Sequence, residues 1–246
     1  AKEKQLVLET VIDQCNGRVP VYAGTGCIST KETIEQSKMA EAAGADVLSI
    51  ITPSFAAASQ EELYVHYKTV AEAVDMPIVL YNIPARTGNA LAPATVGRLA
   101  QIENIVGVKD SSGNFTNILN YINAGNKKTN GKFYTLSGND QLIIWTLLAG
   151  GTGGIAGCAN VYPHTMASIY NLFMEGKIEE AKAANASIQS FRDCFKYGNP
   201  NTIVKTAVRL LGYEVGPCRA PFNQVPEEGI KALKKVLEEN AAKGMN

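Results

Sequence analysis

The stretch "NIVGVKDSSGN", residues 104–114, predicts a short buried strand that ends on a lysine. Ile105, Val106 and Val108 favour β-structure, and the Ser-Ser-Gly-Asn that follows ends the run. A strand that is apolar without alternation is typical of a parallel sheet covered on both faces. An ammonium group at the end of such a strand costs free energy unless it is paired, solvated or neutral. Lys109 therefore requires an explanation.

The chain repeats this pattern at the interval of a βα unit. Helical segments separate the apolar runs: one ends at Gly44, one opens with Ser59 and Glu62 as a capping box, and one carries Pro93 in its first turn. This alternation predicts an α/β fold with a parallel sheet, either open or closed as a barrel. The expected strands lie in residues 19–26, 45–53, 77–84, 105–112, 133–140 and 153–160.

After residue 162 the pattern changes to helices without strands between them. We therefore predict a barrel portion over residues 1–162 and C-terminal helices over residues 163–246. Six strands do not complete an eight-stranded barrel, so a barrel requires two further strands upstream of Ala1. A six-stranded open sheet is the alternative that periodicity leaves open.

Composition excludes several classes of protein. Lys+Arg and Asp+Glu number 23 each, which gives no support for binding to nucleic acid or to an acidic membrane surface. No apolar run approaches the roughly 18 residues of a membrane-spanning helix, and the first residues lack a signal-peptide pattern. Five scattered cysteines without CxxC spacing indicate free thiols in the cytoplasm, and with two histidines they do not predict a metal site.

Polar residues at the predicted strand ends are the candidates for chemistry, because parallel sheets bind ligands there. In a water-poor site the amine of Lys109 can be neutral and attack a ketone to form a Schiff base. Tyr81, at the end of the preceding strand, can move protons, and Arg86 can bind a carboxylate. This chemistry requires no metal and no cofactor. Taken singly, Lys109 could instead be solvated or paired with Asp110, Tyr81 a core residue and Arg86 part of a surface ion pair.

The motifs "YNIPARTGN" (81–89) and "NIVGVKDSSGN" together resemble the pyruvate-dependent class I aldolase superfamily of dihydrodipicolinate synthase and N-acetylneuraminate lyase. The resemblance covers essentially the whole chain. It implies a (β/α)8 barrel with a C-terminal helical subdomain and a homotetramer built as a dimer of dimers. It also implies a lyase of lysine biosynthesis that condenses pyruvate with aspartate semialdehyde to give 4-hydroxy-tetrahydrodipicolinate.

The resemblance also implies roles for single residues. Lys109 matches the Schiff-base lysine, and Tyr81 matches the tyrosine that moves protons to and from the imine. The matched substrate-binding positions are Arg86 for the carboxylate of the second substrate, Ile155 for a backbone carbonyl facing pyruvate, and Ser111 and Asp140 for sugar hydroxyls in the lyase branch.

Two departures from the family pattern bear on the substrate. The threonine motif that holds the pyruvate carboxylate does not occur in the chain and belongs upstream of Ala1. Phe55 stands where the synthase has a relay tyrosine, and a phenyl ring cannot carry a proton. An aldolase or dehydratase of a 2-keto-3-deoxy sugar acid and a weakly active keto-acid-binding paralogue are therefore alternatives. Feedback by lysine is not expected, because Ile28 and Ser54 replace residues of the usual inhibitor site although Glu32 is kept.

Overall fold

The computed structural model describes residues 2–246, which form two compact units. The first unit contains the described residues up to Ser137 together with Ala149–Thr152. The second contains Gly138–Leu148 and Gly153–Asn246. The boundary expected at residue 162 followed a change in sequence pattern, and it remains a prediction.

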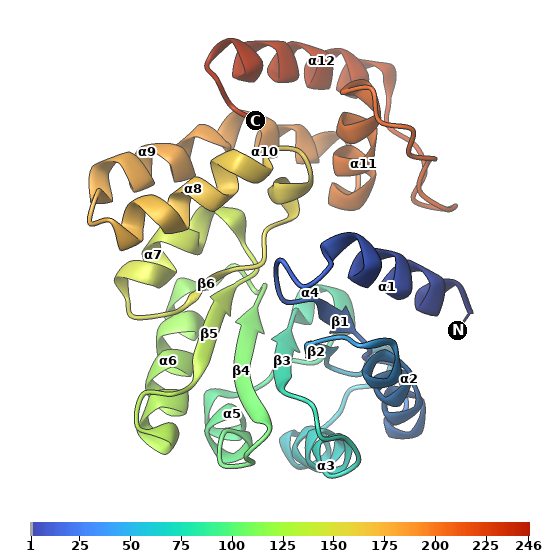
Figure 1. Cartoon of the computed structure of the whole chain (residues 1–246), viewed down its shortest axis with the longest axis vertical. Helices are drawn as coiled ribbons and strands as arrows, with labels where there is room; N and C mark the ends of the chain where they lie inside the picture. Colours follow the sequence, from blue (N-terminus) through green and yellow to red (C-terminus); the bar gives the residue numbers. More distant parts are fainter. Residues whose placement is uncertain (1) are drawn as a thin grey trace. The chain divides into compact units, whose positions relative to one another are not determined.

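The first unit is built on a parallel sheet whose strands stand side by side in chain order (Figure 1). All four pairings between consecutive strands are parallel, which confirms the expected α/β fold with a parallel sheet. Each strand lies inside one of the apolar runs. The strands are β1 (Tyr22–Gly24), β2 (Val47–Ile51), β3 (Ile78–Asn82), β4 (Ile105–Asp110) and β5 (Tyr134–Ser137).

Helices connect these strands and pack against one another in chain order along the sheet (Figure 1). This winding brings the carboxyl ends of all the strands to the same edge. The helices of the first unit are α1 (Lys2–Cys15), α2 (Thr30–Ala43), α3 (Gln60–Ala71), α4 (Pro84–Thr87), α5 (Pro93–Leu99) and α6 (Phe115–Thr129).

Local signals fix the ends of α2 and α3. Gly44 ends α2 with a φ of 90°, a left-handed conformation that glycine adopts without steric cost. Ser59 and Glu62 form the predicted capping box at the start of α3: each side chain accepts the backbone N–H of the other residue. A cap of this kind contributes about 1 kcal/mol.

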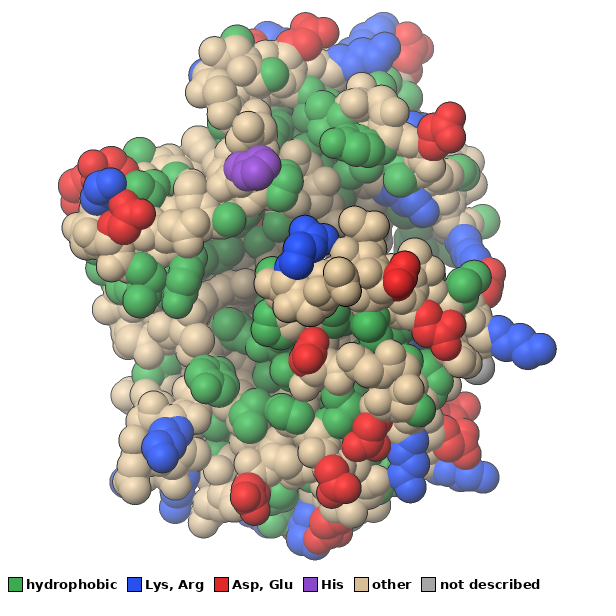
Figure 2. Space-filling model, viewed as in Figure 1, with side chains coloured by type: hydrophobic (Ala, Val, Ile, Leu, Met, Phe, Trp, Pro, Cys, Tyr) green, Lys and Arg blue, Asp and Glu red, His purple; other side chains and the backbone are tan. Residues whose placement is uncertain are grey.

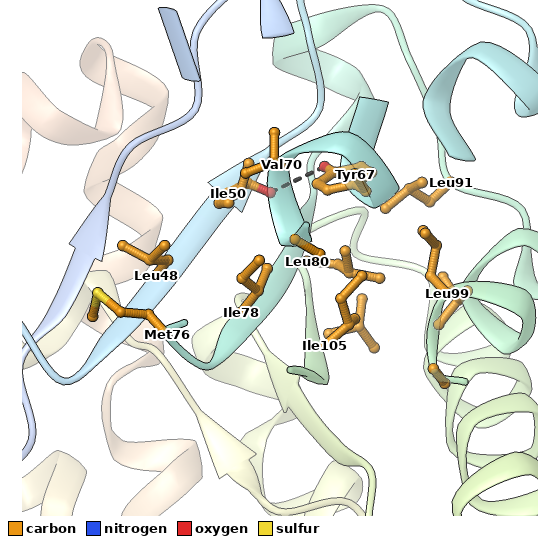
Figure 3. Packing of buried hydrophobic residues seen from close by; sticks show 14 of the residues in the cluster. Leu48, Ile50, Tyr67, Val70, Met76, Ile78, Leu80, Leu91, Leu99 and Ile105 are labelled. Carbon is orange, nitrogen blue, oxygen red and sulfur yellow. Dashed lines mark hydrogen bonds between the residues drawn. The ribbon is translucent and has the colours of Figure 1, made fainter. Parts of the chain in front are cut away.

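The core of the first unit lies between the sheet and its helices. Leu48, Ile50, Ile78 and Leu80 from β2 and β3 are fully buried, and each such side chain contributes roughly 1.5–3 kcal/mol through burial (Figure 3). The aromatic ring of Tyr67 in α3 is buried in this core, and its hydroxyl donates to the carbonyl of Ile50 at 3.0 Å (Figure 3). The bond satisfies a polar group that would otherwise be costly to bury.

The second unit has a separate hydrophobic core formed almost wholly by helices. Phe191 is fully buried and meets Tyr162 edge to face, with ring centroids 5.4 Å apart. The elements of this unit are η1 (Asp140–Leu142), α7 (Ile143–Leu148), β6 (Gly153–Gly154), η2 (Gly157–Asn160), α8 (Pro163–Met174), α9 (Ile178–Ser187), α10 (Gln189–Arg192), η3 (Asp193–Tyr197), α11 (Pro200–Leu210) and α12 (Glu227–Ala242).

On the face shown in Figure 2, acidic and basic side chains are interspersed, in keeping with the equal numbers of each in the sequence. Among residues 2–246, no helix is both long enough and apolar enough to cross a membrane.

Candidate active site

Lys109 and Tyr81 lie opposite each other on neighbouring strands. The register of β3 and β4 pairs Tyr81 with Lys109, and the Nζ atom of Lys109 lies 3.9 Å from the centroid of the tyrosine ring. Both side chains are half-buried at the carboxyl ends of their strands. The structure thus brings together the two residues that the sequence predicts as nucleophile and proton carrier.

The next residue on each strand turns to the other face of the sheet and is buried. Asn82 donates from Nδ2 to Oδ1 of Asp110 at 2.7 Å, and its own Oδ1 accepts the backbone N–H of Leu91 at 3.0 Å. The Asp110 carboxylate also accepts from Ser112 at 2.6 Å and from Asn117 at 3.2 Å. This network fixes the strand ends on which Tyr81 and Lys109 stand.

Asp110 is therefore not an ion-pair partner of Lys109. Its carboxylate is fully buried among neutral donors, and within the described chain no salt bridge joins the two residues. The sequence left a pairing of this kind open. Alternation along β4 explains its absence, because consecutive side chains of a strand point to opposite faces.

Tyr121, which packs near Asp110, has a raised pKa. The main cause is burial, and the negative charge of Asp110 adds to it while a hydrogen bond with Asn117 opposes it. The hydroxyl is therefore protonated and donates to the carbonyl of Leu91 at 2.5 Å. Leu91 is thus held from both its N–H and its carbonyl.

Arg86 lies on α4, a single turn that follows β3 directly, and its side chain is exposed. No salt bridge of Arg86 occurs within residues 2–246, so the predicted alternative of a surface ion pair is not formed there. The guanidinium lines a cavity of about 640 Å³ at the carboxyl ends of β1 and β2. The cavity lining also includes Lys4, Gly26, Cys27, Ile28, Glu32, Glu35, Gln36, Ile51, Thr52, Ser54 and Thr87.

Neither Lys109 nor Tyr81 is among the described residues that line this cavity. Imine chemistry depends on the amine and on the proton carrier beside it, and the strand register brings Lys109 and Tyr81 together outside this cavity lining. Arg86 contributes a cationic side chain to the cavity lining, and Lys109 and Tyr81 stand together on the neighbouring strand ends.

The remaining predicted residues occupy different surroundings. Ser111 is half-buried just after β4, and its N–H donates to the carbonyl of Asn82 at 2.8 Å. Ile155 and Asp140 belong to the second unit, where Ile155 directly follows β6 and is half-buried. The roles predicted for these three residues stay predictions.

Asp140 already has partners within its own unit. Its carboxylate forms a nearly buried salt bridge with Arg192 and accepts the backbone N–H of Cys158 at 3.3 Å. Burial is the main cause of a raised pKa at the Cys158 thiol, and Asp140 adds to it. These contacts fix the start of η2, which follows Ile155 in the chain.

The sequence singled out Thr52 as a polar residue at a strand end, but it did not single out Asn89 or Thr87 beside Arg86. Thr52 and Thr87 are buried and bonded to each other at 2.9 Å, and both Oγ1 atoms contact the carbonyl of Asn89. Such a cluster has no sequence signature, since it joins the residue after β2 to the end of α4 and the residues that follow it. Within residues 2–246, no three His, Cys, Asp or Glu side chains are placed to share a metal ion.

Comparison with known proteins decides the family. A family model described as the dihydrodipicolinate synthetase family matches residues 1–240. The chain belongs to this family. A 4-hydroxy-tetrahydrodipicolinate synthase from Methanopyrus kandleri is 39% identical over 238 residues, covering 96% of this chain and 78% of the relative. One from Methanothrix thermoacetophila is 40% identical over 237 residues, with coverage of 96% and 78%.

Solved structures agree with this family. Dihydrodipicolinate synthase from Thermotoga maritima has a TM-score of 0.93 and 29% identity, covering 98% of this chain and 81% of that one. A prophage protein of the dihydrodipicolinic acid synthase family from E. coli K12, in complex with pyruvate, has a TM-score of 0.91 and 30% identity. That match covers 97% of this chain and 80% of the prophage protein.

Proposed function

We propose that the protein is a Schiff-base lyase that condenses pyruvate with aspartate semialdehyde to give 4-hydroxy-tetrahydrodipicolinate, a step of lysine biosynthesis. The observation that carries the proposal is the pairing of Lys109 with Tyr81 on adjacent strand ends. Family membership supports the same reaction, because the chain matches relatives named 4-hydroxy-tetrahydrodipicolinate synthase over most of their length.

In the proposed reaction, the Lys109 amine adds to the keto carbon of pyruvate, and loss of water gives an iminium ion. The iminium withdraws electrons and acidifies the methyl carbon, which loses a proton to form an enamine. The enamine carbon then attacks the aldehyde, the new alkoxide takes a proton, and the iminium forms again. The amine of aspartate semialdehyde adds to the iminium carbon and expels the Lys109 amine, which closes the ring of the product and frees the enzyme. Tyr81, whose ring lies 3.9 Å from Nζ of Lys109, is the residue that we assign to these proton transfers.

The second substrate carries a carboxylate, for which Arg86 offers a guanidinium on the cavity wall. A guanidinium can bind a carboxylate through two parallel hydrogen bonds, which fixes its orientation as well as its position. We assign Arg86 to this carboxylate, and Ser111, Asp140 and Ile155 to supporting substrate contacts.

The same proposal includes the finer points of architecture. We assign β1 to β6 as the third to eighth strands of a (β/α)8 barrel, which the strand order and the TM-score of 0.93 to the Thermotoga maritima enzyme support. We further propose that the protein forms a homotetramer and is located in the cytoplasm. Catalysis would proceed through the covalent imine without a bound cofactor. The five free cysteines are consistent with a reducing compartment.

The test of this function uses the full-length protein, pyruvate, aspartate semialdehyde and borohydride. We expect turnover, and a reduced pyruvate adduct on the peptide that contains Lys109. Lys109→Arg keeps the positive charge but should lose both. Tyr81→Phe keeps the ring beside Nζ and should lower kcat by roughly 10²–10⁴-fold. An adduct on another lysine, or no product from the assembled parent, would overturn the assignment.

Phe55 supports a second candidate, an aldolase or dehydratase of a 2-keto-3-deoxy sugar acid. Its ring is 97% exposed and has no hydroxyl to complete a proton relay. Phe55→Tyr restores that hydroxyl at a single position, so it is the matched variant for comparing the two reactions. Faster retro-aldol cleavage of sugar acids than synthase turnover in the parent would favour this candidate. Synthase turnover that is equal in the parent and in Phe55→Tyr would count against it.

A further inference from the structure

The loop of residues 53–58, between β2 and α3, has a conformation that its own sequence does not favour. Phe55 has a φ of 83°, in the left-handed region that a bulky side chain adopts only under constraint. Three consecutive alanines, at 56–58, follow it and provide no polar side chain to anchor the loop. Ser54, one residue earlier, lines the cavity that Arg86 also lines. An outside group must therefore hold this loop.

That group is the side chain of Asn89, which is only 3% exposed. Its Nδ2 donates to the carbonyls of Pro53, at 2.9 Å, and Ala56, at 2.8 Å. Its Oδ1 accepts the backbone N–H of Ala58 at 2.7 Å. The two N–H donors and the oxygen of the Asn89 amide thus all bond to the backbone of one loop. These contacts lie on either side of Ser54 and Phe55 in the sequence.

The backbone of Asn89 is fixed at the same time to the turn that carries Arg86. Its N–H donates to Oγ1 of Thr87 at 3.2 Å, and its carbonyl accepts from Thr87 at 3.0 Å and from Thr52 at 3.1 Å. Thr87 is the last residue of α4, next to Arg86. One buried residue therefore joins the loop of Ser54 and Phe55 to the turn of the arginine.

We propose that Asn89 is a positioning residue. It holds the 53–58 loop against the Arg86 turn and thereby determines the KM for the aldehyde substrate. The inference rests on the proposed function in one respect, the assignment of Arg86 to the aldehyde carboxylate. Only an amide fits the contacts, since two donors face carbonyls and one acceptor faces an N–H. Aspartate has the same shape but would direct a carboxylate oxygen at two carbonyl oxygens.

The test compares Asn89→Ala and Asn89→Asp with a matched control, Asn104→Ala. Asn104 also donates from Nδ2 to two backbone carbonyls, that of Ala71 at the end of α3 at 2.9 Å and that of Val74 at 3.0 Å, but it precedes β4 at the opposite end of the sheet. We expect both Asn89 variants to raise the KM for the aldehyde by about tenfold or more. The KM for pyruvate and the yield of borohydride-trapped adduct should stay within about twofold of the parent.

Hydrogen exchange of the amides of residues 54–58 gives a second measurement that does not depend on turnover. Exchange there should become faster in both Asn89 variants and stay unchanged in Asn104→Ala. An unchanged aldehyde KM, or equal changes for pyruvate and aldehyde, would overturn the proposal, as would unchanged loop exchange. If the parent itself shows no turnover, the proposed function fails, and loop exchange still decides whether Asn89 holds the loop.

Discussion

At the scale of single residues, Asp110 raises the question of why a carboxylate is buried next to the strand-end positions of Lys109 and Tyr81. It is fully buried and has no cationic partner within residues 2–246, a situation that costs free energy unless several donors compensate. Asn82, Ser112 and Asn117 provide those donors. The arrangement stabilises the ends of β3 and β4 and turns Lys109 and Tyr81 to the other face.

Replacing Asp110 with Asn should destabilise the first unit by roughly 1–3 kcal/mol, because one carboxylate oxygen becomes an amide N–H₂ that faces either the donors of Asn82 and Asn117 or that of Ser112. Urea unfolding measures this change. Asp75→Asn is the control, since Asp75 is exposed and no hydrogen bond or salt bridge of its side chain occurs within residues 2–246. Equal unfolding free energies for the two variants would contradict the compensating role of the donors.

His66 predicts a dependence of stability on pH. Burial lowers its pKa to about 4, and its Nδ1 lies 2.9 Å from Oγ1 of Thr30. In the unfolded chain the pKa is about 6.5, so below that pH the unfolded state binds a proton that the folded state does not. The stability from this residue is thus complete above about pH 6.5 and decreases as the pH falls toward 4.

Between about pH 7.5 and pH 5, the parent should lose about 2 kcal/mol through His66, measured as the urea unfolding free energy at both pH values. His66→Gln removes the titrating group, so the unfolding free energy of this variant should decrease by correspondingly less over this pH interval. His164, which is exposed, provides the control, and His164→Gln should keep the parent's dependence on pH. A dependence that is the same in His66→Gln and in the parent would rule out this explanation.

At the scale of elements, the close approach of β4 and β5 depends on a glycine. A Cβ atom at Gly107 would lie 2.5 Å from the carbonyl oxygen of Tyr134, a backbone atom that cannot move alone. Gly107→Ala should therefore cost about 1–3 kcal/mol by overpacking, as seen in urea unfolding. Gly24→Ala in β1 is the matched control, because nothing lies within 4 Å of its Cβ position. A Gly107 variant as stable as the Gly24 variant would show that the strands can separate without cost.

Most elements of the first unit could be predicted from sequence because their signals are local. The apolar runs, the glycine after α2 and the capping box of α3 each act within a few residues, and each is confirmed. The position of Lys109 beside Tyr81 follows from strand register and was also predicted. The role proposed for Asn89 could not be predicted, since the loop partners of its side chain lie 31 to 36 residues away and meet it only in the folded chain.

At the scale of the whole molecule, the chain contains two hydrophobic cores. One joins β2, β3 and β4 to α3, α5 and α6, and the other joins α7 to α12. Each unit has its own buried aromatic and aliphatic side chains, so each has its own source of stability.

Two truncations test whether these cores act separately. Leu80→Ala removes a fully buried side chain from the first core, and Phe191→Ala does so in the second. Each should cost roughly 2–5 kcal/mol, because the removed atoms leave a cavity. Hydrogen exchange should become faster mainly in β2 to β4 for Leu80→Ala and mainly in α8 to α12 for Phe191→Ala. Faster exchange throughout both units in either variant would show instead that the two cores unfold as one cooperative structure.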